Sequence, residues 1–182
     1  MDKKISFIGV GPGDPDLLTI KALKKIESAD VIFWADSLIP KKIIDFSLED
    51  SEKIKTSTLT LEKITSIMIE KFNEGKTVIR LHDGDPSLYG AVKEQIEILK
   101  QKKIEIEVIP GISAFQVAAA SHQTELTIPK ITQTIILTRA GGRTGMPEKE
   151  SLKELASHKS TLCLYLSAVS YTHLTLPTTP YV

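Results

Sequence analysis

The sequence has little that would tie it to a disulfide scaffold, to nucleic acid or to a membrane. Its one cysteine, Cys163, lies in an apolar run and reads as a small buried side chain, so no disulfide framework is expected. Basic and acidic residues number 23 each, so no net positive field attracts nucleic acid. No apolar stretch approaches the ~20 residues that span a bilayer, and no hydrophobic signal segment follows Met1. We therefore expect a cytoplasmic protein with neither a nucleic-acid nor a membrane partner.

Clusters of catalytic or metal-binding side chains are also missing. The four histidines are scattered along the chain, at His82, His122, His158 and His173. No Ser-His-Asp set and no metal-ligand spacing accompanies them. The sequence therefore predicts no metal site and no nucleophilic side chain.

Apolar strand-like runs instead alternate with helix-like segments through about residue 121. The pattern predicts strands at 4–10, 30–35, 53–56, 77–82 and 104–109, and helices at 16–28, 40–47, 60–74, 89–101 and 113–121. Such alternation is typical of an α/β fold, in which helices cover both faces of a parallel sheet. We assign residues 1–121 to an N-terminal α/β domain that carries the ligand loops.

The remaining chain predicts a linker and an incomplete second α/β domain. Residues 122–132 are polar and form the linker, and 133–168 begin the second domain, with strands at 133–138 and 160–167 and a helix near 148–157. No charged residue occurs from Ser160 onward. The end, SYTHLTLPTTPYV, has no helix or strand period and resembles a translated sequencing adapter. We expect 169–182 to be a non-native tail and the second domain to be cut short.

Three glycine-containing turns follow predicted strands. They are VGPGDPDLLT at 10–19, DGDPSLYG at 83–90 and VIPGISA at 108–114. Glycine lets a ligand approach main-chain N–H groups at a strand end, and strand ends of one parallel sheet share an edge. The glycine spacing in the first turn does not fit a dinucleotide fingerprint, in which the third glycine lies further on. The turns predict a small-molecule site, the alternative being tight connections that bind nothing.

These three motifs, in this order, resemble those of the tetrapyrrole methylase family, which uses S-adenosylmethionine. WADSLI at 34–39 and ELTIPKITQTIILTRAGGRT at 125–144 are similar to the branch that acts on precorrin-4. The resemblance implies methylation of carbon 11 of precorrin-4 or cobalt-precorrin-4 in cobalamin biosynthesis. It further implies S-adenosylhomocysteine as a product, a tetrapyrrole as the substrate and a homodimer as the assembly.

The resemblance also implies a cofactor site built from several segments. Its residues are Gly11, Pro12, Gly13, Asp83, Gly84, Asp85, Tyr89, Ser113, Ala114 and Leu166. A carboxylate in the second turn could accept hydrogen bonds from ribose hydroxyls or from the amino group of the donor. The alternative for Asp83 and Asp85 is turn capping, and Tyr89 could instead be a core residue of the following helix.

The acceptor side is expected at the end of the second strand and in the second domain. Asp36 and Ser37 are the candidate catalytic residues, because a carboxylate there could bind pyrrole N–H groups or accept a proton. The alternative is a cap or a turn. Arg139 and Arg143 suit the carboxylates that fringe a tetrapyrrole, unless they are ordinary surface cations.

Two other functions fit the same sequence less well. A methylase of this fold could act on another precorrin position, on ribosomal RNA or on a diphthamide precursor, although the absence of net charge disfavours RNA. A nucleotide-binding module without catalysis is the alternative from another class.

Overall fold

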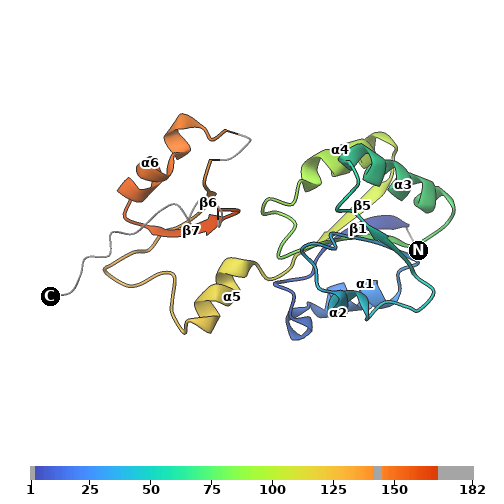
Figure 1. Ribbon diagram of the computed structural model, residues 1–182, viewed down its shortest axis with the longest axis horizontal. Coiled ribbons are helices and arrows are strands. Elements are labelled where there is room, and N and C mark those ends of the chain that lie inside the picture. Colours follow the sequence, from blue (N-terminus) through green and yellow to red (C-terminus); the bar gives the residue numbers. More distant parts are fainter. Residues whose placement is uncertain (1–2, 142–144, 168–182) are drawn as a thin grey trace. The chain divides into compact units, whose positions relative to one another are not determined.

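Two compact units make up the chain, which we describe from a computed structural model covering residues 3–141 and 145–167 (Figure 1). The first unit spans Met1–Val117 and the second Ala118–Val182, so the boundary falls within helix α5 (Ala114–Ser121). Each unit is considered separately below.

A five-stranded sheet forms the centre of the first unit. Its strands are β1 (Lys4–Gly9), β2 (Val31–Trp34), β3 (Glu52–Lys55), β4 (Val78–His82) and β5 (Glu105–Ile109). The spatial order is β3-β2-β4-β1-β5, and every neighbouring pair is parallel. The predicted α/β fold is therefore confirmed, and the loops that follow the strands lie along one edge.

Helices cover both faces of this sheet (Figure 1). Helices α1 (Ile20–Glu27) and α2 (Lys41–Ile44) lie on one face, and α3 (Leu61–Asn73) and α4 (Val92–Gln101) lie on the other. Successive strand residues point to opposite faces, so the core is divided into two clusters. One contains Ile8 and Ile26, and the other contains Phe7, Met68 and Leu99.

Short polar side chains determine where the helices begin. The hydroxyl of Thr19 accepts a hydrogen bond from the Ala22 amide at 3.1 Å, and α1 therefore begins at Ile20. The predicted helix at 16–28 is wrong in its first turn, because Pro15–Leu17 forms a separate 3-10 turn. The helix predicted from residue 89 begins only at Val92, after a loop in which Tyr89 has a φ of 56°.

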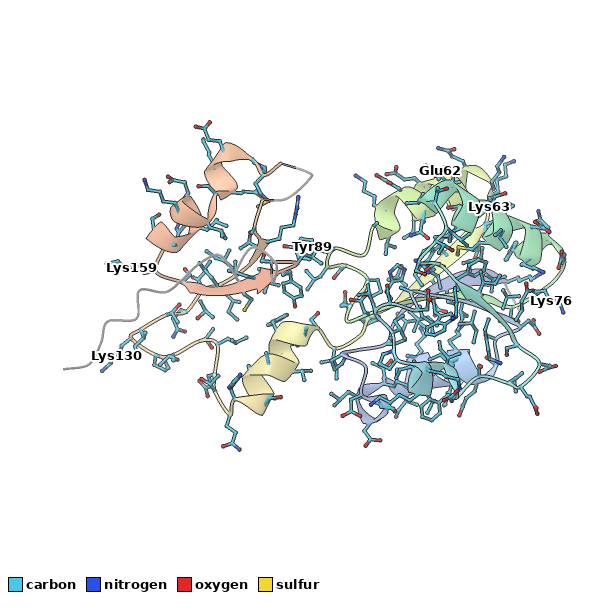
Figure 2. All side chains as sticks on the ribbon, viewed as in Figure 1. Glu62, Lys63, Lys76, Tyr89, Lys130 and Lys159 are labelled. Carbon is cyan, nitrogen blue, oxygen red and sulfur yellow. The ribbon has the colours of Figure 1, made fainter. Side chains whose placement is uncertain are left out.

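Charged side chains lie mainly on the outer surface of this unit. Figure 2 shows Glu62 and Lys63 at the exposed start of α3 and Lys76 on the turn before β4. Among the described residues, no helix is long and apolar enough to cross a bilayer.

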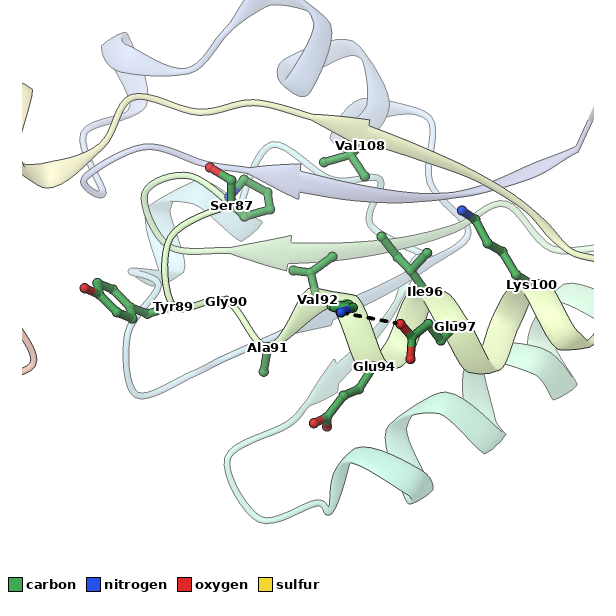
Figure 3. A pocket seen from close by; sticks show the side chains of 12 residues that line it. Ser87, Tyr89, Gly90, Ala91, Val92, Glu94, Ile96, Glu97, Lys100 and Val108 are labelled. Carbon is green, nitrogen blue, oxygen red and sulfur yellow. Dashed lines mark ion pairs between the residues drawn. The ribbon is translucent and has the colours of Figure 1, made fainter. Parts of the chain in front are cut away.

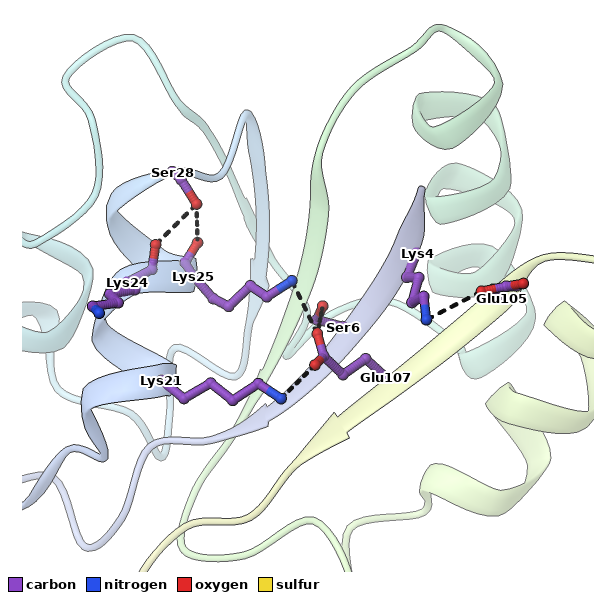
Figure 4. Close-up of polar contacts among 8 residues, drawn as sticks. All are labelled: Lys4, Ser6, Lys21, Lys24, Lys25, Ser28, Glu105 and Glu107. Carbon is purple, nitrogen blue, oxygen red and sulfur yellow. Dashed lines mark hydrogen bonds and ion pairs between the residues drawn. The ribbon is translucent and has the colours of Figure 1, made fainter. Parts of the chain in front are cut away.

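A cluster of polar side chains fastens α1 to the edge strand β5 (Figure 4). Glu107 accepts from Lys21 at 2.6 Å, from Lys25 at 2.9 Å and from the Ser6 hydroxyl at 3.3 Å. The two lysines, Lys21 foremost, lower the pKa of Glu107 to about 2. Glu107 is therefore a carboxylate at neutral pH and ties a helix to the edge of the sheet.

The second unit contains a pair of parallel strands, β6 (Ile135–Arg139) and β7 (Thr161–Tyr165). They are joined through a 3-10 turn at Glu148–Glu150 and the short helix α6 (Leu152–Ser157), which Ser151 caps. Cys163 is half-buried in β7, and burial raises the pKa of its thiol. The predicted tail at 169–182 lies outside the described residues.

Candidate cofactor and acceptor site

The loops after β1 and β4 are joined directly through two glycines. The Gly84 amide donates to the Gly11 carbonyl at 2.8 Å, and the Gly11 amide donates to the Gly84 carbonyl at 3.2 Å. Gly11 has a φ of 70° and Gly84 a φ of 59°, a conformation that side chains disfavour. The bridge therefore holds two of the predicted ligand loops together through their main chains.

The loop after β5 packs against this bridge without room for side chains. A Cβ on Gly111 would lie 2.2 Å from the Gly84 carbonyl oxygen, and a Cβ on Gly9 would lie 2.6 Å from the Gly111 nitrogen. Gly84 differs, because the atom nearest to its Cβ position is the Ser113 Cα at 3.9 Å. Three loops thus meet at the sheet edge, and Gly84 among them is partly exposed, so a ligand could contact its main chain.

The two predicted carboxylates of the second loop have different surroundings. One oxygen of Asp85 accepts from the amide and hydroxyl of Ser87, and the other accepts from the Gly111 amide at 3.0 Å. Burial disfavours the charge of Asp85, but these hydrogen bonds outweigh it and lower its pKa. Asp83 is exposed at the tip of the turn. Asp85 therefore links the loops after β4 and β5, and Asp83 is the more accessible of the two carboxylates.

The other predicted cofactor residues lie in three places. Pro12 is exposed beside Gly13, which packs closely against Pro40. Ser113 is buried, and its amide donates to the Gln116 side chain where Ala114 begins α5. Tyr89 is 44% exposed in the loop before α4, so the alternative that made it a core residue of a helix is wrong.

Three predicted site residues belong to the second unit. Arg139 ends β6, and Leu166 follows β7 and is 78% exposed. Arg143 lies outside the described residues.

Asp36 lies in the turn that follows β2, close to the residues that end β3. The Ser57 amide donates to one carboxylate oxygen at 3.4 Å, and the Lys55 ammonium lies 3.9 Å from the other. Hydrogen bonding from Ser57 and the charge of Lys55 lower the pKa of Asp36, which is an anion at neutral pH. Helix α2 begins after Pro40 without a side-chain cap, so Asp36 does not cap it, and Ser37 is exposed beside it.

Strand β4 carries two buried polar residues, Arg80 and His82, and no site role was predicted for either. Arg80 is only 8% exposed, and its guanidinium donates to the Thr56 hydroxyl at 2.8 Å. Burial lowers the pKa of Arg80 to about 10, so it remains charged at neutral pH. His82 is stacked on Phe7 with ring centroids 5.8 Å apart, and burial together with Arg80 lowers its pKa to about 3. The signal in the sequence was an arginine inside the otherwise apolar run VIRLH.

A hollow of about 690 Å³ lies beside the loop that precedes α4 (Figure 3). Its wall includes Tyr89, Val92, Ile96 and Val108, and the ion pair between Lys93 and Glu97 spans its rim at 4.0 Å. The bridged glycines and Ser113 are not part of this wall. The hollow is therefore separate from the glycine bridge. No group of three potential metal ligands occurs in the described part of the chain.

Comparison with known proteins agrees with this geometry. Relatives named cobalt-precorrin-4 C(11)-methyltransferase from Priestia megaterium and Methanocaldococcus jannaschii are 49% and 48% identical over 91% of this chain. The chain spans 64% of the length of each. The X-ray structure of a cobalt precorrin-4 methyltransferase superposes with a TM-score of 0.89 at 48% identity, covering 91% of this chain and 70% of that one.

The match to a family model extends over nearly the whole sequence. The model for tetrapyrrole (corrin/porphyrin) methylases matches residues 4–175, which include all three glycine-containing turns. With its parallel sheet and bridged strand-end loops, the chain belongs to the tetrapyrrole methylase family.

Proposed function

We propose that this protein is an S-adenosylmethionine-dependent C-methyltransferase that acts on carbon 11 of precorrin-4 or cobalt-precorrin-4 in cobalamin biosynthesis. The observation that carries the proposal is the bridge between Gly11 and Gly84, which joins two strand-end loops and leaves Gly84 partly exposed. The relatives named for this reaction support the choice of acceptor, since their likeness extends over 91% of the chain.

The residues at the sheet edge fit the cofactor. Main-chain groups of the loops at Gly11–Gly13 and Gly84 would contact its adenosine and amino-acid parts, and Ser113 and Ala114 would close one side. Asp83 is the exposed carboxylate that would accept hydrogen bonds from ribose hydroxyls or the amino group. Bound S-adenosylmethionine would supply the methyl group, carried on a positively charged sulfur. Tyr89 and Leu166 remain proposed cofactor contacts.

The reaction requires positioning more than a nucleophilic side chain. Holding donor and acceptor in line and excluding water can account for ~7–11 kcal/mol of the barrier to such a transfer. The Asp36 anion would accept hydrogen bonds from pyrrole N–H groups or take up a proton from the macrocycle, with Ser37 beside it. Arg139 and Arg143 would pair with carboxylates on the rim of the substrate.

The assembly and setting are part of the same proposal. We propose a homodimer in the cytoplasm, with no nucleic-acid partner. The equal numbers of acidic and basic residues support the last point, because RNA binding draws on a basic surface.

Two measurements test the proposed function. Isothermal titration calorimetry should detect one S-adenosylhomocysteine site per chain and no NAD binding. Methyl transfer from labelled S-adenosylmethionine should then favour precorrin-4 or cobalt-precorrin-4 over uroporphyrinogen III and over ribosomal RNA. Binding of NAD without S-adenosylhomocysteine would overturn the assignment, and preference for another acceptor would move the protein to another branch of the family.

A further inference from the structure

Strand β4 lies between the two halves of the proposed site. On one side are β1 and β5, whose loops form the glycine bridge and its surroundings, and on the other are β2 and β3, whose ends surround Asp36. Arg80 is located in the middle of β4, opposite Phe7 of β1 and Phe33 of β2. A cation in this apolar interior loses hydration, so its presence there calls for a reason other than stability.

The guanidinium of Arg80 is fixed by a short chain of hydrogen bonds. It donates to the Thr56 hydroxyl at 2.8 Å, and that hydroxyl in turn donates to the Trp34 carbonyl at 3.1 Å. The Thr56 amide donates to the same carbonyl at 3.0 Å. Among the described residues, no hydrogen-bond partner is present for the Arg80 Nε atom. Thr56 therefore joins the ends of β2 and β3 to the buried cation.

The residues on either side of Thr56 are those that hold Asp36. Lys55 and Ser57 approach its two carboxylate oxygens at 3.9 Å and 3.4 Å, whereas Thr56 between them bonds to Arg80. Trp34, whose carbonyl Thr56 binds twice, lies two residues before Asp36. The carboxylate is thus held from both sides by segments that Thr56 ties together.

We propose that Arg80 and Thr56 are positioning residues that fix the Asp36 carboxylate for the methyl acceptor through this hydrogen-bonded chain. The inference rests on the proposed function, since it takes Asp36 as part of the acceptor site. Arg80 also faces the charge of Asp83 at the end of its own strand. The same buried cation thereby interacts with the charge of Asp83 in the proposed cofactor loop and, through Thr56, with the segment that holds Asp36.

The test is a carboxyl-carbon NMR titration of Asp36 in variants of Thr56. Thr56→Val keeps the shape and net charge but removes the hydroxyl, so the pKa of Asp36 should rise toward that of an ordinary aspartate. Thr56→Ser keeps the hydroxyl and should retain the lowered value. Thr65→Val is the matched control, because Thr65 is also buried and its hydroxyl bonds the Leu61 carbonyl in α3. This control should leave Asp36 unchanged.

Arg80→Met breaks the same hydrogen bond from the other side and provides a second variant if Thr56→Val fails to fold. It too should raise the pKa of Asp36. An unchanged Asp36 pKa in either folded variant would overturn the inference. Turnover of the methyl acceptor should fall about tenfold in Thr56→Val, while the KM for S-adenosylmethionine stays the same.

The proposed function is tested separately by S-adenosylhomocysteine binding to the unaltered protein. If that ligand binds but Thr56→Val leaves Asp36 unaffected, only the positioning role fails. If the ligand does not bind, the methylase proposal fails, and the positioning role that depends on it fails as well.

Discussion

The carboxylate of Asp85 accepts a hydrogen bond from the Gly111 amide at 3.0 Å, across 26 positions of sequence. Its other oxygen accepts from the Ser87 amide at 2.8 Å. A side chain predicted to bind the cofactor therefore also ties the loop after β4 to the loop after β5. Asp83, two residues earlier, makes its carboxylate available to solvent.

We expect Asp85→Asn to destabilise the protein by about 1–2 kcal/mol, because an amide nitrogen cannot accept the hydrogen bonds that the carboxylate receives. Urea unfolding monitored by circular dichroism measures this. Asp83→Asn is the matched control, with a change in unfolding free energy of at most ~0.5 kcal/mol, as for most surface substitutions. Asp83→Asn should nevertheless weaken S-adenosylhomocysteine binding, because Asp83 is the proposed ligand carboxylate. Equal stability of the two variants would contradict the linking role of Asp85.

Gly84→Ala should weaken S-adenosylhomocysteine binding at least about tenfold, equivalent to ~1.4 kcal/mol. The new Cβ would lie in ordinary contact with the Ser113 Cα at 3.9 Å and would be placed at the main-chain surface proposed for the cofactor. The left-handed backbone at Gly84 should add an unfolding cost of about 1–2 kcal/mol. Calorimetry and urea unfolding separate the two effects.

Gly75→Ala is the control for backbone strain alone. Gly75 lies on the turn before β4 and has a φ of 92°. The atom nearest its Cβ position is the Lys3 ammonium nitrogen at 3.9 Å. This variant should lose stability but bind S-adenosylhomocysteine normally. If both glycine variants bind the ligand equally well, the main chain at Gly84 is not part of the cofactor site.

The order of strands and helices along the first unit could be predicted from the sequence because each element has a strong pattern. The run VIRLH predicts a buried strand, and the apolar spacing within 60–74 predicts α3, which Thr60 caps in the structure. Boundaries were less predictable where turns begin. Thr19 competes with Asp14 as a cap, and the left-handed conformations of Tyr89 and Ala91 have no signature in residue type.

The candidate site was only partly predictable, because its contacts depend on the order of strands in the sheet. Glycines after strands predict ligand loops, but which atoms close on one another depends on strand order, which the sequence does not state. The Gly11–Gly84 bridge forms because β1 and β4 are adjacent in the sheet. Arg80 and Thr56 are separated by 24 positions and meet only because β2 places the end of β3 near β4.

The Glu107 cluster predicts how stability depends on pH. Its pKa is lowered to about 2 in the folded protein, so Glu107 contributes stability above the pKa of an unfolded glutamate, 4.5. That contribution is lost as pH falls from about 4.5 to about 2, because protonation breaks the bonds to the lysines. Lys21 is largely exposed, and screening by solvent limits the effect to about 1 kcal/mol.

Glu107→Gln should flatten this part of the pH profile, as followed by urea unfolding at several pH values. Glu105→Gln is the control, since Glu105 pairs with Lys4 at the surface and its side chain is 61% exposed. A wild-type profile in the Glu107 variant would show that the cluster contributes nothing to acid stability.

Asp36→Asn should lower the turnover of precorrin-4 or cobalt-precorrin-4 at least about tenfold, or ~1.4 kcal/mol in transition-state free energy. The amide keeps the size of the side chain but cannot accept hydrogen bonds on both sides or take up a proton. Binding of S-adenosylhomocysteine should stay unchanged, because Asp36 follows β2 while the glycine loops follow β1, β4 and β5. Asp45→Asn removes a carboxylate that pairs with Lys41 on the exposed end of α2 and should leave turnover unaltered. Normal turnover in Asp36→Asn would instead leave Asp36 the structural role of fixing Ser57 at the end of β3.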